Sequence, residues 1–153
     1  MDSVFDFFVK EIENENPVVK VNAVNRLPII IYSYSNPDTK KQDYLNYLEN
    51  FLNKCDLDEV IFGLARALGD LAEYFKMDMM RLLDKLLVNE ETVIREAAIE
   101  SYVKMLKYVS QDDLSNVLVP EILKLKSQKK FPPKISALNL MSEIFPICNQ
   151  KDQ

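Results

Sequence analysis

The sequence contains no histidine and no tryptophan, and only two glycines and two cysteines among its 153 residues. Without histidine, Ser-His-Asp catalysis, Cys-His catalysis and every His-ligated metal site are excluded. Gly63 and Gly69 are too few to build a glycine-rich loop that cradles phosphate. Cys55 and Cys148 stand far apart, which fits neither a CxxC metal pair nor the cysteine density of a secreted disulfide scaffold. The sequence therefore predicts reduced thiols, no catalytic residue, no metal and no cofactor.

Targeting and membrane signals are also missing. The first residues, MDSVFDFFVKEIEN, interleave acids with apolar residues and do not form the basic-then-apolar pattern of a secretory signal. No run approaches the roughly 18 to 20 apolar residues that span a bilayer. We therefore expect a cytoplasmic protein, with the nucleus as the alternative.

Charge and composition restrict the class of partner. Hydrophobic residues make up 48% and charged residues 28% of the chain, and the formal net charge is −5. This is the composition of one soluble globular domain, here residues 1–153. An evenly acidic chain disfavours nucleic acid and anionic membranes, because both attract clustered Lys and Arg. A basic protein surface is the expected partner.

Apolar residues follow helical spacing along nearly the whole chain, and no strand-like alternation competes with it. Two amphipathic stripes are the clearest examples of the i, i+3, i+4 rule. The first is Ile61, Leu64, Ala65, Leu68, Leu71, Ala72 and Phe75, and the second is Ile94, Ala97, Ala98, Ser101, Tyr102, Met105 and Val109. An aromatic group, Phe5, Phe7 and Phe8, has similar spacing and is predicted to form the core and end cap of the first helical pair.

Capping residues indicate where helices start. Asn16-Pro17, Asp56-x-x-Glu59 and Ser110-x-x-Asp113 each place a capping side chain before a helical run. The segments number about eight helices, joined by short turns. Gly63 and Gly69 lie inside one such segment, where each costs about 1 kcal/mol relative to Ala, so close helix packing is the expected reason for them.

The helical segments repeat. Four stretches, PVVKVNAVNRL (17–27), EVIFGLARALG (59–69), TVIREAAIESY (92–102) and PKISALNLMSE (133–143), align when Ala23, Ala65, Ala98 and Ala137 coincide. The alanines are 42, 33 and 39 residues apart, close to the period of helical-pair solenoids. Three residues before each alanine stand Lys20, Phe62, Arg95 and Lys134. Phe62 departs from the pattern, and we expect acids in the first turn and the three bases one turn later to bridge neighbouring repeats.

An acid in the turn followed by Val-x-Arg-x-x-Ala resembles the HEAT repeat. CDLDEVIFGLARALGDLAEYF and LLVNEETVIREAAIESY further resemble the second and third repeats of the scaffold (A, regulatory 65 kDa) subunits of serine/threonine protein phosphatase 2A. The resemblance implies an all-α, right-handed α-solenoid of about four HEAT repeats, each an antiparallel helix pair. The repeats would cover residues 2–35, 36–75, 76–109 and 110–149.

The resemblance also implies a non-enzymatic scaffold. In that family, N-terminal repeats hold a regulatory subunit and C-terminal repeats hold the catalytic subunit. The chain resembles only the N-terminal repeats, so we expect it to bind a regulatory subunit of protein phosphatase 2A but not the catalytic subunit directly. The uncovered face of the fourth repeat, with Leu140, Ile144 and Ile147, is expected to allow self-association.

Turns within the repeats are the candidate partner-binding site, because a solenoid presents them as an exposed ridge. The first three turns, 13–17, 54–59 and 89–92, carry a net charge of −2 each, and residues 126–134 carry +4. The candidate partner-binding residues are Asp56, Asp58, Glu59, Asn89, Glu90, Glu91, Thr92, Lys129 and Lys130. Capped, solvated turns without a partner remain the simpler interpretation for any one of these residues.

Two other functions compete with the phosphatase scaffold. A general HEAT adaptor with another client, such as a transport or assembly factor, would share the fold and the ridge. A HEAT-like alkylpurine DNA glycosylase would need a basic concave surface and aromatic contacts to a flipped base. The acidic charge and the lack of tryptophan disfavour that enzyme.

Overall fold

A computed structural model describes residues 3–33, 40–127, 135 and 137–142 of the chain. Within these ranges the secondary structure is helical and contains no strand. The helices pack in antiparallel pairs, which confirms the expected all-α solenoid class. Lys129, Lys130 and Lys134 lie outside the described residues.

Most helices are regular α-helices, and two short segments have other helical forms. The bounds are α1 Ser3–Ile12, α2 Pro17–Ser33, α3 Lys41–Lys54, α4 Asp58–Asp70, α5 Ala72–Phe75, the 3-10 helix η2 Lys76–Met79, α6 Met80–Leu87, α7 Thr92–Leu106, α8 Gln111–Asp113, the π-helical segment η3 Leu114–Leu118 and α9 Val119–Ser127. Residues 137–142 are also helical.

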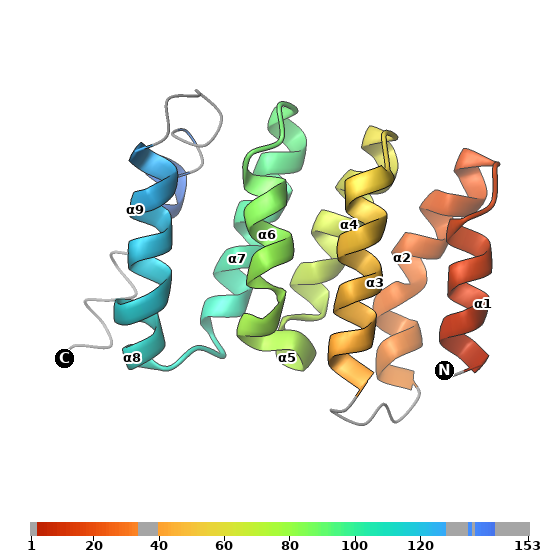
Figure 1. Cartoon of the computed structure of the whole chain (residues 1–153), viewed down its shortest axis with the longest axis horizontal. Coiled ribbons are helices and arrows are strands. Elements are labelled where there is room, and N and C mark those ends of the chain that lie inside the picture. The colour runs from red at the N-terminus through yellow and green to blue at the C-terminus, as the bar shows by residue number, and fades with distance from the viewer. Residues whose placement is uncertain (1–2, 34–39, 128–134, 136, 143–153) are drawn as a thin grey trace.

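Two layers of helices form a row (Figure 1). The first helices of the pairs, α1, α3, α6 and α9, make one layer, and the second helices, α2, α4 and α7, lie behind them. Within the second layer, α4 packs extensively against both α2 and α7, whereas α3 and α6 touch only slightly in the first layer. The stack is therefore tighter on the side of the second helices.

Small residues explain this tightness. A Cβ placed on Gly63 of α4 would lie 3.2 Å from Val24 Cγ1 of α2. One placed on Gly69 would lie 2.8 Å from Ser101 Oγ and 3.3 Å from Ser101 Cα, both on α7. The two glycines thus occur where neighbouring helices approach most closely, as their position inside a helix predicted.

A continuous apolar core fills the space between the layers. Every member of the two amphipathic stripes predicted from the sequence is buried in it. Phe5 and Phe8 are also buried, and the Phe5 ring stacks on the Tyr44 ring of α3 with 4.3 Å between centroids. The prediction was wrong for Phe7, whose side chain is 59% exposed because it lies on the opposite face of α1.

Helix starts agree with two of the three capping predictions described by the structure. Asn16 Oδ1 accepts from the Val18 amide at 2.9 Å, and Ser110 Oγ accepts from the Asp113 amide at 3.2 Å. The Asp56-x-x-Glu59 prediction was wrong, because α4 starts at Asp58 after the N-cap residue Leu57, which has no side-chain cap.

Leu140, near the end of the described residues, tests the prediction that the fourth repeat has an uncovered apolar face. Leu140 is fully buried, so the prediction that its side chain belongs to an exposed apolar face was wrong. Helical periodicity turns this residue toward the same core as Ala137, one turn earlier. Ile144 and Ile147 lie outside the described residues.

Candidate partner-binding ridge

Three turns within the helix pairs lie along one edge of the stack (Figure 1). They join α1 to α2, α3 to α4 and α6 to α7. We call these turns, residues 13–16, 55–57 and 88–91, together with the first residues of the helices that follow them, the ridge. The structure therefore aligns turns that are about forty residues apart in the sequence, as the repeat spacing predicted.

Most candidate binding residues are accessible on the ridge. The exposed ones are Asp56, Asp58, Glu59, Glu90, Glu91 and Thr92, and Asn89 is half-buried. Lys129 and Lys130 lie outside the described residues, so the basic end of the predicted ridge stays a prediction. Across the second and third turns, the exposed carboxylates make an acidic edge.

Arg95 holds the third turn in shape. Its guanidinium is buried, with the residue only 7% exposed, although it lies one turn into α7. Nη1 donates to the carbonyl oxygens of Asn89 and Glu90, each at 2.8 Å, and Nη2 donates to Thr92 Oγ1 at 3.1 Å. These bonds satisfy backbone and hydroxyl acceptors of the turn and of the first residue of α7, which lie beyond the end of α6. The turn that presents Glu90 and Glu91 is thereby fixed against its own helix pair.

Lys20 performs the same task in the first turn. It occupies the position aligned with Arg95, and its Nζ donates to the carbonyl oxygen of Ile12 at 2.9 Å, at the end of α1. Asparagine side chains add a second shared feature, because Asn14 accepts from the Asn16 amide and Asn89 accepts from the Glu91 amide, both at 2.8 Å. The sequence signal that could have revealed this turn is an Asn two residues before the N-cap.

The aligned bases were expected to bridge neighbouring repeats, and the structure corrects this. In both described cases the base bonds its own helix pair, because the side chain points back along the helix toward its N-terminus. Lys20 bonds the last carbonyl of α1, and Arg95 bonds two turn carbonyls and the Thr92 hydroxyl. The second pair has Phe62 at this position, so its turn lacks such a donor.

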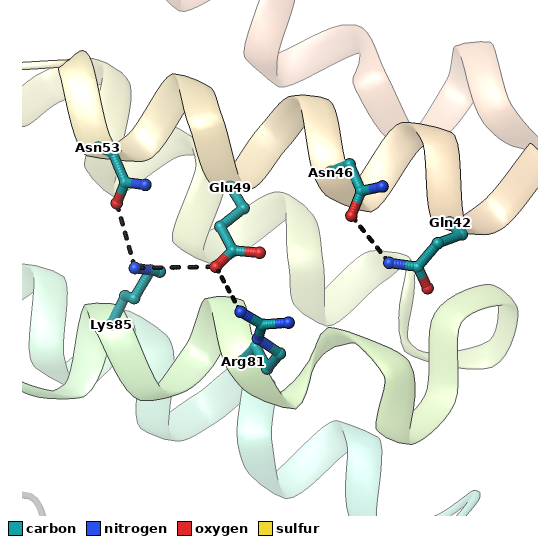
Figure 2. A network of polar contacts seen from close by, with 6 residues as sticks. All are labelled: Gln42, Asn46, Glu49, Asn53, Arg81 and Lys85. Carbon is teal, nitrogen blue, oxygen red and sulfur yellow. Dashed lines mark hydrogen bonds and ion pairs between the residues drawn. The ribbon is translucent and has the colours of Figure 1, made fainter.

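Ion pairs between repeats involve other residues: Lys104 of α7 pairs with Asp70 of α4 on the second-helix layer, and a larger group lies on the first-helix layer (Figure 2). Glu49 of α3 accepts from Arg81 of α6 at 3.1 Å and lies 3.8 Å from Lys85 Nζ. Lys85 also donates to Asn53 at 3.1 Å. Exposed pairs of this kind each contribute little stability, about 0 to 1 kcal/mol, and they fix the register of α3 against α6 more than they stabilise it.

A cavity of about 290 Å³ opens between the first two turns of the ridge. Its lining residues are Glu13, Lys20, Tyr47, Asn50, Phe51, Lys54, Cys55, Asp56 and Leu57. Tyr47 donates to Glu13 at 2.9 Å, and burial, followed by this bond, raises the pKa of Tyr47. Two lysines, Lys20 and Lys54, and two aromatic rings therefore interrupt the acidic ridge at this cavity. The net charges of the turns did not predict this feature.

One half-buried carboxyl, that of Asp84, lies away from the ridge, on the first-helix layer. Burial raises the pKa of Asp84 on α6 to about 6, and Glu121 of α9 raises it further while Lys124 lowers it. The buried hydroxyl of Tyr102 is near enough for Asp84 to raise the pKa of Tyr102, although burial is the larger cause. Between about pH 4 and 6 the folded chain thus binds more protons than the unfolded chain, so stability falls as pH rises through this window.

Replacing Asp84 by Asn tests how much stability the folded chain loses when Asp84 is ionised. We expect Asp84→Asn to raise the free energy of unfolding by about 1–2 kcal/mol at pH 7, a value reduced for partial solvent screening. The gain should vanish near pH 4, where Asp84 is protonated in the folded chain. Urea unfolding of both chains at the two pH values measures it. The exposed neighbour change Asp78→Asn should alter stability by less than about 0.5 kcal/mol, and equal gains for Asp84→Asn at both pH values would contradict the buried charge.

Other kinds of site are not seen in the described ranges. No group of three or more Cys, Asp and Glu side chains there could hold a metal ion. No helix in the same part of the chain is both long and apolar enough to cross a membrane. What the described surface offers is a charged edge whose first and third turns are held by hydrogen bonds, which is an arrangement suited to binding another protein.

Sequence comparison identifies relatives that match most of this chain. The chain is 30% identical over 149 residues to the "Serine/threonine-protein phosphatase PP2A 65 kDa regulatory subunit" of Drosophila melanogaster, covering 93% of this chain and 24% of the relative. It is 26% identical over 146 residues to the "Protein phosphatase 2A scaffold subunit" of Dictyostelium discoideum, covering 92% of this chain and 25% of the relative. Over most of its length the chain is similar to protein phosphatase 2A scaffold subunits.

Another relative agrees. The Caenorhabditis elegans "Probable serine/threonine-protein phosphatase PP2A regulatory subunit" is 28% identical over 145 residues, which cover 90% of this chain and 24% of the relative. The chain spans about a quarter of the length of the curated relatives it matches, and the matched part is N-terminal in the scaffold subunits. No protein-family profile matches the chain. These relatives are named as regulatory or scaffold subunits and not as catalytic ones.

Proposed function

We propose that this chain is a non-enzymatic scaffold that binds a regulatory subunit of protein phosphatase 2A along the ridge. The observation that carries the proposal is the fixed third turn, where Arg95 bonds hold Glu90 and Glu91 exposed beside the exposed acids of the second turn. A partner meets a surface that is already ordered, so binding loses little conformational entropy there. The similarity to scaffold subunits supports the phosphatase assignment over another client.

The proposal also says which phosphatase subunit this chain does not bind. The segment matched in the scaffold subunits is N-terminal, and the resemblance assigns the catalytic subunit to C-terminal repeats of that family. We therefore propose that this segment does not hold the catalytic subunit directly. The repeat bounds 2–35, 36–75, 76–109 and 110–149 belong to the same proposal, as does a cytoplasmic location, with which the free Cys55 thiol is compatible.

Ridge charges set the expected chemistry of the partner. Their shared negative sign requires a basic complementary surface, and exposed charges of this kind act mainly on the rate and orientation of encounter. A single exposed charge contributes about 0 to 1 kcal/mol, so single substitutions are a poor test. Asp58 is the first residue of α4, and the start of this helix has no side-chain cap. We therefore give Asp58 a role in partner binding only and none in capping the helix.

Reversing Glu90 and Glu91 together to Lys tests the ridge. We expect the association rate with a purified regulatory subunit to fall several-fold at low salt, and the dependence of that rate on ionic strength to flatten. Helix content by circular dichroism should stay unchanged, because neither side chain makes a hydrogen bond in the described structure. The measurement is association rate against ionic strength for both chains.

A control with the same change in net charge separates the ridge from the general field of the protein. Asp78→Lys with Asp112→Lys alters two exposed acids that lie off the ridge. This variant should keep most of the association rate and its salt dependence. Superimposable curves for wild type and the ridge reversal, or equal losses in both double variants, would refute docking on the ridge.

A further inference from the structure

A second surface is formed by exposed residues of the second helices α4 and α7 and of residues 137–142. None of the candidate ridge residues lines it. One cavity of about 300 Å³ is lined by Phe62, Arg66, Val93, Glu96, Ala97 and Glu100. The next, of about 260 Å³, is lined by Glu96, Ile99, Glu100, Asn139 and Ser142. The two share Glu96 and Glu100, so they adjoin across α7 and form one groove, which we call the second-helix groove.

An apolar floor runs through this groove. Val93 is 57% exposed, and Phe62 is half-buried at the position where α2 and α7 carry a turn-holding base. Because Phe62 has no such role, its ring is left to line the groove, with the Arg66 guanidinium 5.8 Å from the ring centroid. Exposed apolar area of this kind is where binding free energy comes from when a partner covers it.

Two carboxylates stand at the junction of the cavities. Glu96 and Glu100 are exposed, one turn apart on α7, and neither forms an ion pair within the described residues. Like charges at this spacing destabilise a helix by about 0.2–0.5 kcal/mol. Lys104, one turn further, pairs instead with Asp70 at 3.6 Å. Among the lining residues that the structure describes, Arg66 is thus the one cation against two carboxylates.

We propose that the second-helix groove binds a short segment of a partner protein in which Lys or Arg alternates with apolar side chains. The cation lies between Glu96 and Glu100, and the apolar side chains cover Phe62, Val93 and Ile99. At about 300 and 260 Å³, the two cavities are at or below the small end of ligand pockets, so they accommodate individual side chains of a segment that runs across both. The unpaired carboxylates favour this occupant over nucleic acid or an anionic lipid surface, which they repel. This contact is separate from regulatory-subunit docking on the ridge.

Peptide titration of the whole chain tests the groove. The probe is the acetylated peptide SGLKLRLGS, followed by 1H–15N NMR of the 15N-labelled chain, and its charge-reversed counterpart is SGLELELGS. We expect saturable shifts at outward residues of α4 and α7, and no saturable shifts with the counterpart. Glu96→Gln with Glu100→Gln should weaken SGLKLRLGS binding at least five-fold.

Two matched variants make the result specific. Asp78→Asn with Asp112→Asn removes the same charge away from the groove and should change the affinity less than two-fold. The ridge reversal of Glu90 and Glu91 should likewise leave peptide shifts on α4 and α7 in place, so failure of the ridge and failure of the groove are told apart.

Several outcomes would overturn the proposal. Shifts centred on the ridge turns, equal weakening by both neutralised doubles, equal binding of SGLELELGS, or no saturation by millimolar peptide would each do so. A different occupant is also tested, because shifts at α4 and α7 that grow with the concentration of the chain alone would assign the groove to a second copy.

Discussion

Arg95→Met is expected to lower the free energy of unfolding by about 2–3 kcal/mol. The buried guanidinium makes three hydrogen bonds to the turn between α6 and α7, and bonds to charged groups contribute about 1.5–3 kcal/mol in such settings. A methionine side chain fills similar space but donates nothing, so the carbonyls of Asn89 and Glu90 lose their donor. Urea unfolding at pH 7, followed by circular dichroism, measures the loss.

Two comparisons distinguish the loss of bonds from the loss of packing. Arg95→Lys should recover part of the stability, because Lys20 makes a single equivalent bond in the first turn. Amide hydrogen exchange in Arg95→Met should become faster at residues 89–92 while α4 keeps its protection, since the bonds hold only that turn. If Arg95→Met and Arg95→Lys lose the same stability, the hydrogen bonds are not the cause of the loss, and if both match wild type the turn does not depend on Arg95.

Such a variant also bears on function. The ridge presents Glu90 and Glu91 from the turn that Arg95 holds, so a loosened turn has to be ordered again on binding. We expect Arg95→Met to raise the dissociation rate of a ridge partner while leaving the salt dependence of association unchanged. The reversal of Glu90 and Glu91 to Lys should do the opposite: it lowers the association rate and flattens the salt dependence of that rate.

Gly69→Ala is expected to lower the free energy of unfolding by up to about 2 kcal/mol. An Ala in a helix normally gains about 1 kcal/mol over Gly. Here the new methyl would lie 2.8 Å from Ser101 Oγ and 3.3 Å from Ser101 Cα, and the backbone of α7 cannot move without disturbing the core. Overpacking of this kind costs about 1–3 kcal/mol, which exceeds the gain. Urea or thermal unfolding gives the difference.

Gly63→Ala is the matched control. Its methyl would meet Val24 Cγ1 at 3.2 Å, which is a side-chain contact that a small rotation relieves. The gain in helix propensity should therefore roughly cancel the strain, and stability should change by less than about 0.5 kcal/mol. A Gly69→Ala chain as stable as the Gly63→Ala chain would show that α4 and α7 have room to separate.

Ser101 contacts Gly69 and therefore offers a further test of the Gly69→Ala prediction. Its hydroxyl donates to the carbonyl oxygen of Ala65 on α4, so the contact at Gly69 and this bond act on the same helix pair. Ser101→Ala in the Gly69→Ala background removes the closest clash but also the bond. The two effects are coupled, and a double-mutant cycle should show non-additive stabilities.

Local patterns in the sequence determined which residues face the core. The stripes from Ile61 to Phe75 and from Ile94 to Val109 are buried throughout, because helical periodicity alone sets which face of a segment is apolar. The same reasoning predicted the helix start at Pro17 and the cap at Ser110. The spacing of Ala23, Ala65 and Ala98 predicted the repeat, and with it the alignment of the acidic turns along one edge.

Only the tertiary structure decided what the polar side chains contact. Arg95 was expected to reach a neighbouring repeat and instead bonds its own turn, and Phe7 was expected in the core and is exposed. Asp84 gives no sequence sign that α9 will cover it, and Glu96 and Glu100 give none that they join two cavities. These outcomes depend on the distance and register between helices far apart in the sequence, whereas periodicity specifies only the direction of a side chain on its own helix.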